Sequence, residues 1–269
     1  MLEFLQQFFP EVGASTWKER MGRGEVVDAE GVRISPGQKY LAGGQIYYYR
    51  EVADEMPIPF EYTILFKDEH LLVVDKPHFL PVIPSGRYLH ETLLVRLKHR
   101  LQLEHLTPIH RLDRETAGVI LFSHNPHSRG GYQSLFHQKK MRKTYEALAP
   151  ILAGQVLPMT HCSRMVAGEP FFRMQETQGE PNSETYIELL ESRGKMGLYR
   201  LCPVTGKKHQ LRVHMASLGI PIVNDCFYPM LQAEKGNDFS RPLQLLARSI
   251  AFIDPYTGQD RCFQSTRML

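Results

Sequence analysis

The chain has 269 residues, of which 42% are hydrophobic and 23% are charged, and its formal net charge is +3. These values are ordinary for a globular protein with room for one large domain, or for one large and one small domain. They exclude a protein that depends on disulfide staples for its core, and no segment reaches the ~18 apolar residues that a membrane-spanning helix needs.

The cysteines and the N-terminus indicate a compartment. Four widely spaced cysteines form no C-x-x-C pair, which favours reduced thiols over disulfides or a zinc site. The first residues, MLEFLQQFFPEV, contain an early acid and lack the basic flank and cleavage site of a signal peptide. We therefore expect a cytoplasmic protein, and a monomer as the default state.

Residues 1–56 differ in pattern from the rest and predict a small N-terminal module. Over 26–34, apolar residues alternate loosely with polar ones around a turn at 29–31, and the aromatic run over 45–50 resembles a strand. The acidic pair Asp54-Glu55 and the prolines of 57–59 predict a linker. Residues 57–269 then form the main domain.

The first half of the main domain predicts strands interrupted by two helices. Two β-rich runs, 62–66 and 71–74, flank a hairpin signal. Leucines at helical spacing over 93–101 predict a helix, and the apolar run 119–122 predicts a buried strand. Asn125-Pro126 opens a helix running toward Lys140, and the alternation over 143–148 predicts a further strand.

The second half predicts more hairpins and one helix. Turns are expected near 168–169, 193–194 and 256–258, and a helix over 208–218 is closed by Gly219. Many strands joined by hairpins, with few helices, predict an α+β domain built on a mixed, largely antiparallel sheet with flanking helices.

Positive charge is clustered although the net charge is small. One group over 129–143 contains no acid, and two smaller groups lie over 96–100 and 207–212. Solvated helix faces account for most charge runs. Two of these groups adjoin motif residues, however, which favours contacts with the phosphates of a nucleic acid.

Residues 110–118, HRLDRETAG, are dense in ionisable groups. Asp113 lies between Arg111 and Arg114, directly before an apolar strand. A structural segment has little use for such groups beside a buried strand. The pattern is typical of a polyanion-binding site with one working carboxylate.

The pattern H-R-L-D-x-x-T-A-G resembles the catalytic motif of the RluA family of RNA pseudouridine synthases. Other segments resemble that family in the same order, and together they cover about residues 62–265: 68–77, 143–145, 205–214, 221–228 and 254–258. The departures are small, with Ala117 in place of Ser, Lys207 in place of Arg and Asn224 in place of Gly. None of these removes a catalytic group.

The resemblance implies a pseudouridine synthase fold and an enzyme that isomerises specific uridines in structured ribosomal or transfer RNA. The reaction breaks the glycosidic bond, rotates the uracil and rejoins it through carbon, so we expect no cofactor and no metal. By resemblance Asp113 is the catalytic carboxylate, Arg212 pairs with it and keeps it charged, and Tyr145 stacks on the flipped-out base. The sequence leaves open whether Asp113 attacks the ribose, attacks the base or assists a proton transfer.

Further residues are assigned to substrate binding. Leu211 is expected to pack on the base. Of Arg111 and Arg114, we expect one to bind phosphate or fill the vacated stack and the other to hold the loop. His110 is expected to be a structural hydrogen-bonder rather than a general base. The remaining assigned residues are Lys207, His209, Gln210, Lys139 and Lys140.

Alternatives remain at this point. A catalytically inactive RNA-binding protein of the same fold is disfavoured by the presence of Asp113, Tyr145 and Arg212. A glycoside or nucleoside hydrolase would need a second acid, for which only Glu115 is near. His209 and His214, five residues apart, lack the spacing of a helical zinc pair. The N-terminal module weakly resembles the small RNA-binding domain that often precedes these catalytic domains; otherwise it is an extension packed on the core.

Overall fold

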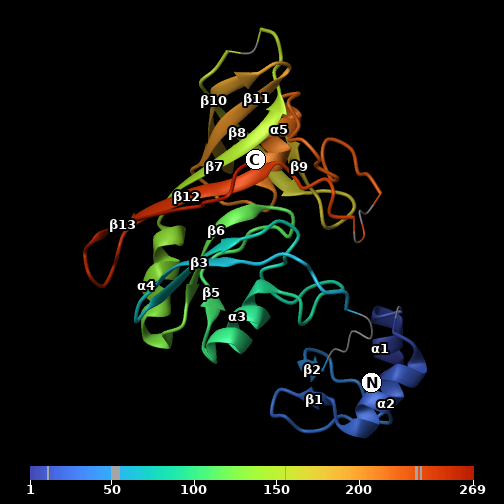
Figure 1. Ribbon diagram of the computed structural model, residues 1–269. Helices are drawn as coiled ribbons and strands as arrows, with labels where there is room; N and C mark the ends of the chain where they lie inside the picture. Colours follow the sequence, from blue (N-terminus) through green and yellow to red (C-terminus); the bar gives the residue numbers. More distant parts are fainter. Residues whose placement is uncertain (11, 50–54, 155, 234–235, 237) are drawn as a thin grey trace. The chain divides into compact units, whose positions relative to one another are not determined.

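The computed structural model describes residues 1–10, 12–49, 55–154, 156–233, 236 and 238–269. Arg50 of the predicted aromatic strand and Asp54 of the predicted linker lie outside the described residues. The chain divides into two compact units, Met1–Asp54 and Glu55–Leu269 (Figure 1).

The first unit has a core of its own around the fully buried Trp17. Helices α1 (Leu2–Phe8) and α2 (Ala14–Arg23) precede a two-stranded sheet of β1 (Val26–Asp28) and β2 (Ile46–Tyr48). Neither helix is predicted from the sequence. The buried face of α2 consists of Trp17, Arg20 and Met21 at helical spacing, and the charge of Arg20, which lies 5.6 Å from the Trp17 ring, hides this apolar pattern.

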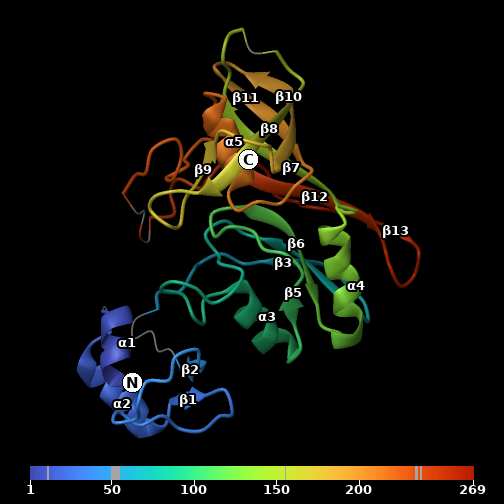
Figure 2. The same cartoon turned by 180° about the vertical axis from the view of Figure 1, so that it is seen from behind.

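The second unit is built on one mixed sheet in which β12 (Leu245–Ile253) lies between two groups of strands (Figures 1 and 2). The order is β3-β4-β6-β12-β7-β11-β10-β8-β9. Among the described strands only β6 and β12 pair in parallel, which confirms the predicted α+β, largely antiparallel fold. The strands before β12 are β3 (Thr63–Lys67), β4 (Leu71–Lys76), β5 (Thr107–Pro108), β6 (Ala117–Ser123), β7 (Arg142–Pro150), β8 (Met159–Ala167), β9 (Met174–Thr177), β10 (Ser183–Arg193) and β11 (Met196–Pro203).

The predicted hairpins are present. The turns near 168–169, 193–194 and 256–258 join β8 to β9, β10 to β11, and β12 to β13 (Asp260–Gln264), each as an antiparallel pair. Strands β3 and β4 also pair as expected, with β3 at the edge of the sheet, and β5 pairs with β6.

Among the described residues of the second unit, three helices cover the sheet. Helix α3 (Leu93–Leu101) and helix α4 (Pro126–His137) lie on the β3–β6 side of β12, and α5 (Gln210–Ser217) lies against β9 and β10 (Figures 1 and 2). Helix α5 starts two residues later than predicted because His209 has a left-handed φ of 55°. No helix of the described residues is both long and apolar enough to cross a lipid bilayer.

The contact between β6 and β12 depends on Gly118. This residue has a φ of +112°, and a Cβ built on it would lie 2.2 Å from the carbonyl oxygen of Ala247 on β12. Only a residue without a side chain allows this approach. The loop that holds Asp113 enters β6 directly before this contact. By letting β6 approach β12, the glycine of the HRLDRETAG motif fixes where that loop lies.

Candidate active site

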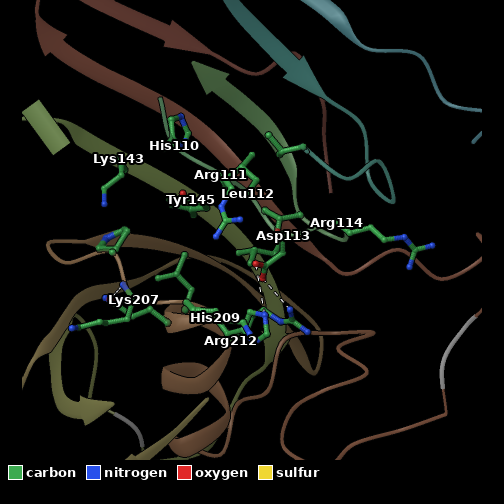
Figure 3. A pocket seen from close by; sticks show the side chains of 18 of the residues that line it. His110, Arg111, Leu112, Asp113, Arg114, Lys143, Tyr145, Lys207, His209 and Arg212 are labelled. Carbon is green, nitrogen blue, oxygen red and sulfur yellow. Dashed lines mark hydrogen bonds and ion pairs between the residues drawn. The ribbon is translucent and has the colours of Figure 1, made fainter. Parts of the chain in front are cut away.

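Asp113 and most of the other predicted site residues line one pocket of about 570 Å³. Its walls are formed by the loop over 110–116, by β7, and by the segment over 203–212 that enters α5 (Figure 3). The pocket therefore lies where the two halves of the sheet meet. Predicted site residues that line it are His110, Arg111, Asp113, Arg114, Tyr145, Lys207, His209, Gln210, Leu211 and Arg212.

Asp113 and Arg212 meet directly although they are 99 residues apart in sequence. Nη1 of Arg212 donates a hydrogen bond of 3.0 Å to Oδ2 of Asp113 (Figure 3). The Arg212 side chain is buried, whereas 31% of the Asp113 side chain is exposed to the pocket. The carboxylate is thus held by a buried cation and remains accessible to a ligand.

A second carboxylate, Asp225, fixes the orientation of Arg212. Nε and Nη2 of Arg212 each donate to one oxygen of Asp225 at 2.7 Å, which is the bidentate geometry that arginine favours. Asp225 is fully buried and also accepts the backbone N–H groups of Phe227 and Tyr228. Since Asp225 occupies the other edge of the guanidinium, Nη1 is the donor directed at Asp113.

The surroundings keep Asp113 ionised. Burial alone would raise its pKa, but His209, Arg212 and Lys76 outweigh burial and hold the pKa of Asp113 below its usual value. Burial lowers the pKa of His209 to about 4, so that imidazole carries its charge only at acidic pH, where Asp113 itself titrates, and is neutral near pH 7. Arg212 is therefore the fixed cation that faces Asp113 at neutral pH.

Tyr145 and Leu211 are part of the apolar lining of the pocket. Tyr145 extends from β7, and burial together with the charge of Asp113 raises the pKa of its phenol above the usual value. The hydroxyl is therefore protonated at neutral pH. Leu211, on the first turn of α5, is 7% exposed and lines the same pocket.

The two arginines beside Asp113 lie in different environments. Arg114 extends away from Asp113 and donates to Oε1 of Glu115 at 2.7 Å (Figure 3). Its guanidinium also lies 5.2 Å from the ring of Tyr88. Arg111 is exposed at the pocket and has no hydrogen bond or ion pair within the described part of the chain. Arg114 is thus tied to the protein, and Arg111 is available to a ligand.

The polar groups of His110 and Gln210 are used within the protein. Nε2 of His110 accepts the backbone N–H of Leu121 at 3.1 Å, and burial lowers the pKa of His110 to about 3. The amide of Gln210 makes four hydrogen bonds: it accepts from Thr205 and the Lys207 backbone, and it donates to the Glu184 backbone and Thr185. Both side chains shape the pocket wall.

Of the remaining predicted substrate-binding residues, some line the pocket and others lie outside it. His209 lies with Nε2 3.8 Å from Oδ1 of Asp113, and its Nδ1 bonds to the Tyr228 hydroxyl at 2.9 Å. Lys207 is exposed at the pocket rim. Lys139 and Lys140 are exposed in the turn after α4 and do not line the pocket.

A buried lysine that is not among the predicted site residues supports the loop of Asp113. Nζ of Lys76, at the end of β4, donates to three backbone carbonyls: Pro77 at 2.9 Å, Leu80 at 2.8 Å and Arg114 at 3.1 Å. Burial lowers its pKa to about 7. Lys76 and Asp225 are both in segments that resemble the family, so the sequence held a signal for them.

Comparisons with known proteins agree on one family. The family model described as RNA pseudouridylate synthase matches residues 70–217. The tRNA pseudouridine synthase C of Vibrio parahaemolyticus is 34% identical over 75% of this chain and 89% of its own length. The dual-specificity RNA pseudouridine synthase RluA of Vibrio vulnificus is 32% identical over 71% of this chain and 78% of its own. The structure of human RNA pseudouridylate synthase domain containing 4 has a TM-score of 0.59 at 25% identity, covering 76% of this chain and 87% of that one.

Proposed function

Because this chain belongs to the RNA pseudouridylate synthase family and isomerises uridine in RNA to pseudouridine, we propose that Asp113, Tyr145 and Arg212 carry out this reaction on transfer RNA. The observation that carries the proposal is the Asp113–Arg212 pair, in which a buried cation keeps a carboxylate ionised at the wall of an accessible pocket. The preference for transfer RNA is supported by the likeness to the tRNA pseudouridine synthase C of Vibrio parahaemolyticus.

The chemistry fits these residues. A pocket of about 570 Å³ can take a nucleotide that has left its stack, and leaving the stack costs a few kcal/mol. The Tyr145 ring and Leu211 offer apolar surface against which the uracil can pack while its glycosidic bond is open. Because the reaction returns the same base to the same ribose, the site must exclude water and hold the base, and it needs no redox group.

The substrate class is tested by nucleoside analysis. Purified protein is incubated separately with unmodified transfer RNA and with ribosomal RNA transcripts, and both are digested and analysed for pseudouridine. We expect pseudouridine in transfer RNA. Pseudouridine in ribosomal RNA alone would overturn the proposed substrate, and free uracil in place of pseudouridine would indicate a hydrolase.

Tyr145 should act through its ring. A Tyr145→Ala variant is expected to lose about 1–3 kcal/mol of stacking, which is about a 5- to 150-fold lower kcat/KM. A Tyr145→Phe variant keeps the ring and should stay within about 3-fold of the wild type. Steady-state kinetics on transfer RNA measure both, with thermal unfolding as the control for packing. Equal damage in the two variants would assign the effect to the hydroxyl instead.

Lys139 and Lys140 should bind phosphate remote from the reacting base. The Lys139→Ala/Lys140→Ala variant is expected to bind RNA more weakly and to flatten the plot of log affinity against log salt by about 0.7–0.9 per lost contact. Binding is measured by filter retention at several salt concentrations. The exposed pair Lys67→Ala/Lys195→Ala, which lies outside the unit Met1–Asp54, serves as the matched control. A slope equal to that of the wild type would show that Lys139 and Lys140 face solvent only.

We also propose that the unit Met1–Asp54 contributes to RNA binding, that the protein is a monomer and that it works in the cytoplasm. The last point is supported by its free cysteines, Cys162, Cys202, Cys226 and Cys262, which suit a reducing compartment. Size-exclusion chromatography with light scattering tests the monomer.

A further inference from the structure

Three side chains that can ligate a metal converge on the far side of α5. They are His161 of β8, Glu176 of β9 and His214 of α5. Nε2 of His161 lies 2.9 Å from Oε1 of Glu176, and Nε2 of His214 lies 3.9 Å from the same oxygen. One donor atom from each residue falls within 4.8 Å of the other two. Three separate elements thus direct nitrogen and oxygen donors at one point.

This cluster is separate from the pocket of Asp113. None of the three residues is among the described residues that line that pocket. Arg212 and His214 are two residues apart on α5, which places them about 200° apart around the helix axis. The helix therefore presents Arg212 to Asp113 on one side and His214 to the cluster on the other.

The donor set matches one class of cation. Two imidazole nitrogens and one carboxylate oxygen are the three protein ligands of many zinc sites, with water as the fourth ligand. Donors at about 2.0–2.1 Å from a tetrahedral ion lie ~3.3–3.4 Å apart, and the two distances to Oε1 of Glu176 lie on either side of this spacing. Calcium and magnesium prefer oxygen donors and are disfavoured here.

The cluster is also reachable and locally supported. His214 is fully buried, whereas the side chains of His161 and Glu176 are 18% and 23% exposed, which leaves a solvent side for entry and for a water ligand. Ser217 donates to Glu176 at 3.1 Å and holds that carboxylate in place. The hydroxyls of Ser163 and Ser183 lie 3.2 and 3.0 Å from Nε2 of His214, and a bound ion would replace these two contacts at that nitrogen.

We propose that His161, Glu176 and His214 bind one Zn²⁺ ion. The ion would link the β8–β9 hairpin to α5, the helix from which Arg212 reaches Asp113, and so would stabilise that helix without taking part in the reaction. The competing explanation is a hydrogen-bonded network of the same side chains with the three serines. The two explanations differ in whether the full-length protein binds the ion.

Isothermal titration calorimetry of the chelator-treated, full-length protein with ZnCl2 tests the site. We expect one ion per chain with a Kd below about 1 μM, a higher melting temperature on zinc addition, and no binding of MgCl2. In a parallel titration with CoCl2, the wild type should develop the visible absorption bands of tetrahedral Co²⁺. No saturable binding by the wild type would leave the hydrogen-bonded network as the explanation.

Variants locate the ion. His161→Ala/Glu176→Gln should lose the cobalt bands and the high-affinity zinc site, and Glu176→Gln alone, which keeps the shape of the side chain, should bind zinc at least about 10-fold more weakly. The exposed pair His127→Ala/Glu180→Gln is the matched control and should bind as the wild type does. Zinc binding that survives in both Glu176 variants would place the ion elsewhere and overturn the proposal. Pseudouridine formation is not a readout here, so this result is independent of the proposed substrate.

Discussion

An Asp113→Asn variant is expected to form pseudouridine at least about 10³-fold more slowly than the wild type, which corresponds to ~4 kcal/mol of lost transition-state stabilisation. Asparagine has the same shape and can still accept the hydrogen bond from Nη1 of Arg212. It cannot supply the negative charge or the basic oxygen of the carboxylate. The variant therefore removes the chemistry and leaves the pocket in place.

Single-turnover reactions on transfer RNA, followed by nucleoside analysis, measure this loss. RNA affinity and thermal unfolding are the controls, and both should stay close to the wild-type values because Asp113 is partly exposed and its hydrogen bond is retained. Equal amounts of pseudouridine from the two proteins would show that Asp113 is not the catalytic group.

The second large effect is expected at Arg212. An Arg212→Met variant leaves the fully buried carboxylate of Asp225 without its cation, and breaking a buried pair in this way costs about 3–5 kcal/mol of unfolding free energy. It also removes the cation beside Asp113, so the pKa of Asp113 should rise and activity should fall. Urea denaturation measures the stability loss.

A double variant separates the two roles of Arg212. Arg212→Met/Asp225→Asn removes both charges, and the amide oxygen can still accept the backbone N–H groups of Phe227 and Tyr228. We expect it to recover most of the stability and none of the activity. Arg200→Met, which breaks an exposed pair with Glu188, should cost less than about 1 kcal/mol. A double variant as unstable as Arg212→Met would mean that lost packing, and not the unpaired charge, causes the instability.

The local parts of the fold could be predicted from the sequence. Hairpins such as β10–β11 are marked by a turn glycine between alternating runs, and the helix start at Asn125-Pro126 is a local capping signal, so neighbouring residues alone specify them. The parallel contact of β12 with β6 was not predictable, because it joins Leu246 to Ala117 across more than a hundred residues. The helices of the first unit were missed because the buried face of α2 includes a charged arginine.

The residues of the candidate site that lie in sequence motifs could be predicted from the sequence. The residues of HRLDRETAG and the segment with Arg212 were found by resemblance, and the structure brings Asp113 and Arg212 together. Asp225 and Lys76 lie in segments that resemble the family, but residue spacing does not predict what they do. Asp225 orients Arg212 and Lys76 holds the loop of Asp113 through contacts that form only in the folded chain. The same holds for His161, Glu176 and His214, whose convergence depends on the pairing of β8 with β9 and on the placement of α5.

The central place of β12 has a consequence for how the enzyme is made. Among the described strands, β12 alone pairs with both β6 and β7, so it joins the half of the sheet that carries Asp113 to the half that carries Tyr145 and Arg212. A ribosome synthesises every strand of this sheet except β13 before β12 emerges. Such late, non-local pairing is slow. We therefore expect the nascent chain to stay inactive on the RNA around it until translation has passed β12.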